Sequence, residues 1–433
     1  MPITEHTAQA ATHVGVFKPT PSLLSAPASS ACAVQPYADE SQSIFDHSIQ
    51  SHELGSEQTP DGAFRRNPVT LIAGFGDRDG QIPVIPNRYH VLGALGCGWN
   101  RRQRIALRLT GVDHVVIPEI VYGRDDDGWR IIRQPGGVVE RFGTERVNDF
   151  YRRTDPTFQP DPSKPNYKWR GTTPVVVDIE TGLIVSNNYH TLTNEWETAW
   201  KPFHKPGAFD LYPRPLRREI DLLNQQIFDD VNNGTYKVIF ARSQDAANAA
   251  YTVFKARLAD YDFRLESRRY LFGPNITDSD IRLFQTLESY EYTYRPGIAK
   301  RLPNIDVLHI WDFPNLWAYA RDLFATDGFI DKGEQYELGF IPWSDDLRTW
   351  YGDLPDRYPD QYREGEYAGA FSHDDRGPFG AHSTDKGEHY EYLERWQEAA
   401  RREHLTGSAE YSGPGGGGFY KLFGLKGHRD FYD

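Results

Sequence analysis

The stretch RYHVLGALGCGWNRRQRIALRLTGVDHVVIPEIVYG, residues 88–123, is the part of the chain from which the fold is predicted. Its apolar start predicts a strand over 88–95, and the helical spacing that follows predicts a helix over 97–111 that ends at Gly111. Residues 113–123 predict a second strand. Strand, helix and strand in this order form a βαβ unit, and Cys97 stands at the start of its helix.

The α/β domain predicted around this unit spans residues 61–198. An insertion at about 123–170 follows the second strand and contains a helical pattern over 145–155. Two short β-branched runs, 172–178 and 182–187, are joined by the turn sequence IETG and predict two more strands. The domain is therefore of the α/β class, with its sheet completed by strands that follow the insertion.

Three further regions complete the predicted organisation. Residues 1–60 are rich in Ala, Ser, Thr, Pro and Gln, which predicts a mobile or extended arm. From about 199 to 326 the apolar residues recur at helical spacing and predict an all-helical second domain, in which Asp280 lies three residues after Thr277 as an acidic capping arrangement. Residues 327–433 form a C-terminal extension that we expect to be irregular, with its Tyr and Trp residues packed against the domains.

The charge and cysteine content restrict the class of protein. A net charge of −13 over 433 residues argues against a general binder of nucleic acid or anionic membranes, because such binding needs clustered cations. The chain has only two cysteines, no CxxC, and no apolar run near the roughly 20 residues that span a bilayer. We therefore expect a cytoplasmic protein that acts on small molecules.

Cys97 has two interpretations. As a nucleophile, it faces unsatisfied N–H groups and the positive end of the helix dipole, which stabilise a thiolate; Arg101 adds positive field, and Gly96 and Gly98 leave room for a substrate. As a packing residue, it is one of the small apolar side chains that are commonly buried. The residues alone leave both interpretations open.

No metal site is expected. His373, His382 and His389 are spaced by nine and seven residues, which is not a typical zinc pattern. Asp77 and Asp79 resemble only part of a calcium loop.

Several segments make the sequence resemble the glutathionyl-hydroquinone reductases, the xi class of glutathione transferases. They are RYHVLGALGCGWNRR, VNDFYRRTDPTF, TTPVVVDIETGLIVSN and, most specifically, DLYPRPLRREIDLLNQQIFDDVNNGTYKVIFA with RYLFG and TDSDIRLFQTL. The resemblance covers residues 83–325 and implies a thioredoxin-like domain followed by a helical domain of the glutathione-transferase type, with N- and C-terminal extensions. It also favours the nucleophile interpretation of Cys97.

The resemblance implies a thiol site around that cysteine. Trp99 matches an indole that lies beside the cofactor, and Arg101 is expected to line the same site. The family has Cys-Pro-Trp-Ala where this chain has Cys-Gly-Trp-Asn, so Gly98 and Asn100 depart from the pattern. Either the sulfur chemistry is retuned or it has been lost.

A second part of the expected thiol site lies just before the third strand and near the end of the sheet. Thr173 and Pro174 occupy the position of a cis-proline whose neighbouring backbone binds the cofactor. The family then presents Glu-Ser to the γ-glutamyl end of glutathione, but this chain has Asn188 and Tyr189. The lost carboxylate indicates that glutathione binds weakly or that another low-molecular-weight thiol, such as mycothiol, takes its place.

The resemblance also suggests residues for an aromatic substrate. Tyr294 matches a tyrosine that faces this substrate, Tyr290 lies on the same face, and Tyr236 is expected at the mouth of the cleft. The predicted activity is reductive cleavage of a thiol conjugate of a quinol-like aromatic through a mixed disulfide of Cys97. Two alternatives stay open: a thiol-conjugating or thiol-lyase enzyme, and a non-catalytic binding protein. A homodimer is expected from the superfamily.

Overall fold

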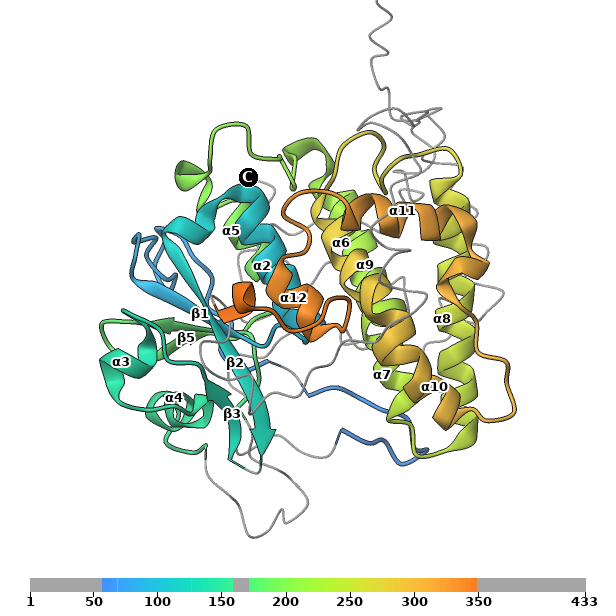
Figure 1. The fold of residues 1–433 in the computed structure, drawn as a ribbon, viewed down its shortest axis with the longest axis horizontal. Coiled ribbons are helices and arrows are strands. Elements are labelled where there is room, and N and C mark those ends of the chain that lie inside the picture. Colours follow the sequence, from blue (N-terminus) through green and yellow to red (C-terminus); the bar gives the residue numbers. More distant parts are fainter. Residues whose placement is uncertain (1–56, 68, 126, 159–170, 349–433) are drawn as a thin grey trace, which may run out of the picture. The chain divides into compact units, whose positions relative to one another are not determined.

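The computed structural model describes residues 57–67, 69–125, 127–158 and 171–348. The predicted arm, apart from its last residues, and the extension beyond residue 348 lie outside these ranges, as do the three histidines considered for zinc. Figure 1 shows the described part as a sheet with its helices beside a group of longer helices. The α/β half and the helical half of the sequence prediction are both present.

A five-stranded mixed sheet forms the α/β half, in the order β3-β2-β1-β4-β5. β1 and β2 are parallel, and every other neighbouring pair is antiparallel. The strands are Tyr89–Gly93 (β1), Val116–Asp125 (β2), Gly128–Ile131 (β3), Val175–Asp178 (β4) and Ile184–Ser186 (β5). The predicted βαβ unit is confirmed, and the insertion contributes the edge strand β3.

α2, Gly98–Thr110, connects β1 to β2. Gly111 ends this helix as predicted, in the left-handed conformation at φ 77°, which glycine adopts without a Cβ clash. Almost all of α2 is buried, because it contacts α5 (Leu192–Glu197) on one side and α9 (Asp278–Ser289) on the other. The insertion adds α3 (Val138–Phe142) and α4 (Val147–Thr154); α4 is the helix predicted over 145–155.

The helical half was predicted as regular helices, and the structure interrupts them twice with π-helical turns. Ile227–Asn232 separates α6 from α7, and Tyr290–Tyr294 separates α9 from α10. Helical periodicity does not reveal such turns, which are frequent at functional sites. The helices are α6 (Arg217–Gln226), α7 (Asn233–Ile239), α8 (Gln244–Leu265), α9, α10 (Arg295–Arg301) and α11 (Pro314–Phe324).

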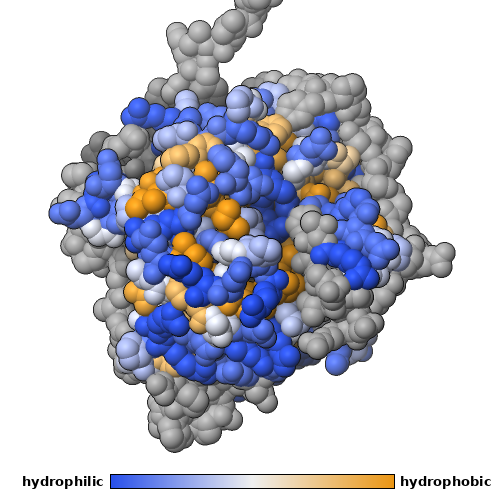
Figure 2. Space-filling model, turned by 60° about the vertical axis from the view of Figure 1, so that its left-hand side comes forward, coloured by the Kyte–Doolittle hydropathy of each residue, from blue (hydrophilic) through white to orange (hydrophobic). Residues whose placement is uncertain are grey.

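The predicted capping arrangement at the start of α9 is confirmed. The backbone N–H of Thr277 donates to Asp280 Oδ2 over 2.7 Å. One core cluster continues from the sheet through α2 into α8 and α9, so the two halves share buried apolar surface. Within the described ranges no helix combines the length and apolarity needed to cross a bilayer. On the face in Figure 2, apolar residues form small groups between hydrophilic ones.

The expectation of an irregular chain after residue 326 is partly wrong. α12, Lys332–Glu337, forms there because Asp331 and Glu334 make a capping box. The Glu334 carboxylate is buried and pairs with Arg104 and Arg108 of α2. The expected aromatic packing is confirmed for residues 327–348, where Tyr336 and Trp343 lie 5.5 Å apart and Tyr336 joins a core cluster with Leu95. α12 lies across α2 in Figure 1.

Candidate functional site

Cys97 is the residue at which α2 begins. Its backbone is extended (φ −98°, ψ 118°), and its carbonyl accepts the first helical bonds, from the N–H groups of Asn100 (2.9 Å) and Arg101 (3.0 Å). The residue is half-buried, and Gly96 before it is exposed. The cysteine therefore lies at the positive end of the helix with one side open to solvent, as the nucleophile interpretation requires.

An aromatic cluster adjoins Cys97. The indole centroid of Trp99 lies 5.0 Å from the ring of Tyr189, 5.6 Å from Phe228 and 6.0 Å from Tyr236. Trp99 Nε1 donates to the Tyr236 hydroxyl over 3.2 Å. Three predicted site residues, Trp99, Tyr189 and Tyr236, are thus brought together with the half-buried Cys97, although α2, the turn before α5 and α7 are far apart in the sequence.

Tyr294 joins this cluster from the π-helical turn after α9. Its ring centroid lies 5.9 Å from that of Tyr236, and the two hydroxyls influence each other's pKa. Burial, followed by the nearby tyrosine and Cys97, raises the pKa of Tyr294 well above its usual value, and burial raises the pKa of Tyr236 too. Both phenols therefore hold their protons at neutral pH and are positioned as proton donors.

Gly98 permits this arrangement. A Cβ added at residue 98 would lie 3.3 Å from the Gln285 carbonyl oxygen and 3.6 Å from the Tyr294 hydroxyl oxygen. The missing side chain therefore lets α9 and the following turn approach the start of α2 closely. The departure from the family's proline has a structural reason here.

The peptide bond between Thr173 and Pro174 is cis, as expected. Asn100 Nδ2 donates to Thr173 Oγ1 over 3.0 Å, which connects this bend to the first turn of α2. The second departure from the family pattern, Asn100, is therefore used to hold the bend beside Cys97.

The side chain of Asn188 is engaged in its own turn before α5. Asn188 Oδ1 accepts from the N–H of His190 over 3.3 Å, and Ser186 Oγ accepts from the N–H of Asn188 over 3.2 Å. The neighbouring Tyr189 is directed to Trp99, and its carbonyl accepts from Arg102. Of these two predicted residues, Tyr189 is the one that joins the cluster.

Arg101 and Tyr290 are not brought to the cluster. Arg101 Nε donates to Glu288 Oε1 over 2.5 Å and Nη1 to the Leu95 carbonyl over 3.0 Å, and both charged side chains are 1 % exposed. The ring of Tyr290 stacks on Phe254 at 5.6 Å, and its hydroxyl donates to a backbone carbonyl. In this structure Arg101 joins α2 to α9, and Tyr290 packs in the helical core.

Two cations that the sequence did not predict lie at the cluster. The guanidinium carbon of Arg66 lies 4.5 Å from the ring centroid of Tyr236 and 5.2 Å from that of Trp99. The guanidinium carbon of Arg102 lies 5.1 Å from the same indole. Arg102 could have been suspected because it is three residues after Trp99 on a helix, but Arg66 belongs to a segment without periodicity.

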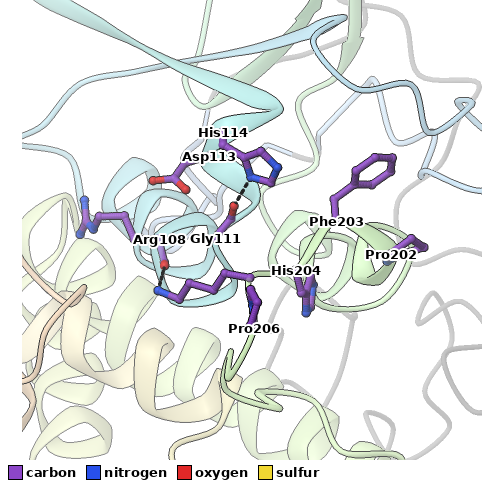
Figure 3. A pocket seen from close by; sticks show the side chains of 9 residues that line it. Arg108, Gly111, Asp113, His114, Pro202, Phe203, His204 and Pro206 are labelled. Carbon is purple, nitrogen blue, oxygen red and sulfur yellow. Dashed lines mark hydrogen bonds between the residues drawn. The ribbon is translucent and has the colours of Figure 1, made fainter.

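A surface hollow at the C-terminal end of α2 is not part of this site (Figure 3). Its cations are already engaged, since Lys205 Nζ donates to the Arg108 carbonyl over 2.8 Å and His114 Nδ1 lies 2.5 Å from the Gly111 carbonyl. α2 has 13 residues, which places the hollow roughly 20 Å from Cys97. In the described part of the chain, no group of three or more His, Cys, Asp or Glu side chains is placed to hold a metal ion.

A thioredoxin-like sheet with a cis-proline, joined to a helical half and carrying a cysteine at the first helix, is the arrangement of the glutathione transferases. No protein-family model matches the chain. It is 31 % identical over 248 residues to glutathionyl-hydroquinone reductase YqjG of Escherichia coli, covering 57 % of this chain and 71 % of that protein. It is 28 % identical over 235 residues to glutathionyl-hydroquinone reductase PcpF of Sphingobium chlorophenolicum, covering 53 % and 70 % of the two chains.

Solved structures agree with these relatives. A glutathione transferase from Gordonia bronchialis matches with a TM-score of 0.54 and 35 % identity, over 70 % of this chain and 90 % of that one. The glutathione-bound structure of YqjG matches with a TM-score of 0.53 and 26 % identity, over 76 % and 96 % of the chains. The chain belongs to the glutathionyl-hydroquinone reductase family, the xi class of the glutathione transferase superfamily.

Proposed function

We propose that this enzyme reductively cleaves thiol conjugates of quinol-like aromatics through a mixed disulfide of Cys97. The observation that carries the proposal is the convergence of Cys97, at the N-terminus of α2, with the buried Tyr236–Tyr294 pair. A nucleophile and a proton donor at one place are the two groups that this reaction needs. The E. coli and S. chlorophenolicum relatives, named for such a reductase activity, support it.

In the proposed first step, the Cys97 thiolate attacks the thioether sulfur of the conjugate. A sulfur–sulfur bond forms, the sulfur–ring bond breaks, and the ring leaves with the bonding electron pair and takes a proton, so the aromatic is reduced. Tyr236 accepts a hydrogen bond from Trp99 Nε1, and in this proposal the neighbouring Tyr294 hydroxyl is a second donor to it, which leaves the Tyr236 hydroxyl hydrogen to be directed at the leaving ring. Tyr294 stabilises the Tyr236 phenolate that results.

In the second step, a free thiol attacks the mixed disulfide. The products are the disulfide of the two small thiols and the Cys97 thiol, so two thiol sulfurs are oxidised for each aromatic reduced. Glutathione is the first thiol to be tested, because the E. coli relative has a glutathione-bound structure. Mycothiol is the second, because Asn188 and Tyr189 replace the carboxylate and hydroxyl of the family pattern.

The decisive experiment replaces Cys97 by alanine. With glutathionyl-hydroquinone and glutathione as substrates, the expected result is loss of both hydroquinone and glutathione disulfide from the products. Cys32→Ala is the matched control, since Cys32 is the only other cysteine in the chain. Full turnover by Cys97→Ala would show that the mechanism is wrong, and a stable conjugate instead of a disulfide would indicate a conjugating enzyme.

A homodimer in the cytoplasm is part of the same proposal. Superfamily members commonly form two-fold dimers, and a reducing compartment preserves a reactive thiol. Sedimentation velocity on the full chain tests the dimer, which a single monomeric species at micromolar concentration would exclude.

A further inference from the structure

Two arginine side chains lie against the Trp99 indole, and the described part of the chain gives neither of them a carboxylate partner. Arg66 precedes the sheet in the chain, and Arg102 is in the first half of α2; their guanidinium carbons lie 5.2 and 5.1 Å from the indole centroid. Among the residues that the structure describes, neither arginine forms an ion pair, whereas Arg101, Arg104 and Arg108 of α2 all do. Arg66 and Arg102 therefore differ from the other arginines near this site in having no ion pair among the described residues.

Both side chains also keep donors without an acceptor in the described part of the chain. Arg102 is fully buried, and although Nη2 donates to the Tyr189 carbonyl, Nε and Nη1 have no partner among the described residues. Arg66 Nε donates to Asn233 Oδ1 over 2.9 Å, but the buried Nη2 has no partner within the same ranges. Burial and the like charge of Arg282 lower the pKa of Arg102. Asp278 acts in the opposite direction without pairing with Arg102. An unpaired guanidinium away from water is costly, and a negatively charged ligand that accepts from these donors removes that cost.

We propose that Arg66 and Arg102 form an anion subsite beside Cys97, which binds a carboxylate of the thiol substrate. Guanidinium groups suit this ligand because their fork of donors matches the two oxygens of a carboxylate. The subsite adjoins the cysteine, since Cys97 and Tyr236 pack in one cluster with Trp99 and the Arg66 guanidinium carbon lies 4.5 Å from the ring centroid of Tyr236. The inference rests on the proposed function only in taking this site to bind a thiol.

The two arginines restrict the class of thiol that this subsite binds. Asn188 is engaged in its own turn and Tyr189 packs on Trp99, so the residues at the family's Glu-Ser position supply no charge. Recognition by Arg66 and Arg102 instead requires a negatively charged group on the ligand. A carboxylate-bearing peptidic thiol such as glutathione fits, whereas mycothiol, which has no carboxylate, does not.

The test measures binding without turnover. The full chain carrying Cys97→Ala is titrated calorimetrically with S-methylglutathione and with its dimethyl ester, which differ only in their carboxylates. We expect the acid to bind at least about tenfold more tightly than the ester, as charge-assisted hydrogen bonds require. Because no reaction is monitored, this result stands or fails separately from the reductase assay.

Arg66→Gln in the same background should remove most of this preference, whereas Arg65→Gln, at the exposed neighbouring residue, should keep it. Arg66 carries the test because Arg102 is fully buried, and unchanged thermal unfolding confirms that each variant is folded. Equal binding of acid and ester, or an undiminished preference in Arg66→Gln, overturns the proposal. If only benzoate, compared with benzamide, binds in an Arg66-dependent way, the carboxylate belongs to the aromatic substrate, and the assignment to the thiol is wrong.

Discussion

The buried Arg101–Glu288 pair provides the sharpest test of how the site is held. The two side chains are 1 % exposed and 2.5 Å apart, and they connect α2 just after Cys97 to α9 just before Tyr290. Removing one partner of a buried ion pair leaves an uncompensated charge and costs about 3–5 kcal/mol. Arg101→Met and Glu288→Met should each lower the free energy of unfolding by this amount and the melting temperature by on the order of 10 °C.

The double variant distinguishes a structural pair from a cofactor-binding arginine. Arg101→Met/Glu288→Met removes both charges of the pair and leaves neither uncompensated, so it should recover at least about 2 kcal/mol of the summed losses, as coupled sites do. Recovery is incomplete because the Leu95 carbonyl loses its donor. Arg130→Met is the control: its pair with Asp125 is exposed and should contribute less than about 1 kcal/mol.

The dependence on pH gives this prediction a second readout. Burial raises the pKa of Glu288 to about 7, against the opposing charge of Arg101. Without Arg101 the folded-state pKa rises further above its unfolded value, so stability is lost as pH rises and kept as pH falls. The Arg101→Met penalty should therefore be larger at pH 8 than at pH 5 in urea unfolding. Additive single-variant losses, or a penalty that grows at acid pH, would refute the structural role.

Three further predictions follow from the same geometry. Tyr294→Phe should lower kcat about a hundredfold with little change in KM, because the proton donor Tyr236 loses the neighbouring hydroxyl. Tyr290→Phe should lower the free energy of unfolding by about 1 kcal/mol and leave kcat unchanged. Equal losses of kcat in the two variants would contradict a catalytic role for Tyr294 alone. Burial raises the pKa of Asp229 to about 7, so the contribution of this group to wild-type stability should fall as pH rises from about 4 to 7. Asp229→Asn should lack this loss, and its free energy of unfolding at pH 8 should exceed that of the wild type by up to about 4 kcal/mol. A variant less stable than the wild type at pH 8 would contradict this expectation. Glu334→Ala should raise amide hydrogen exchange over residues 327–348, because buried Glu334 pairs with Arg104 and Arg108, whereas Asp346→Ala, in an exposed pair, should not.

Local sequence signals were sufficient for most of the fold. The βαβ unit, the end of α2 at Gly111 and the Thr277–Asp280 cap each depend on neighbours in the chain, and all were predicted correctly. The two π-helical turns and α12 were not predicted. A π turn leaves the apolar spacing almost unchanged, and the short α12 depends on Glu334 pairing with arginines more than 200 residues away.

The candidate site also contains residues that could be predicted from the sequence and residues that could not. Cys97 and its helix start follow from the sequence, and the resemblance to the xi class led to Trp99, Tyr236, Tyr294 and the cis-proline. Arg66 was missed because a side chain before the first strand gives no periodic signal of where it packs. Arg101 was expected at the site because it follows Cys97 closely in the sequence, but in the structure it pairs with Glu288.

That a cysteine begins the helix of a βαβ unit could be predicted from the sequence alone, because strand, helix and cap depend on residues close together in the chain. Which side chains surround that cysteine depends on the tertiary structure. Tyr236, Tyr294 and Arg66 reach it from segments far apart in the sequence. Burial, which no local pattern specifies, keeps the phenols protonated, and two arginines have no counterion among the described residues.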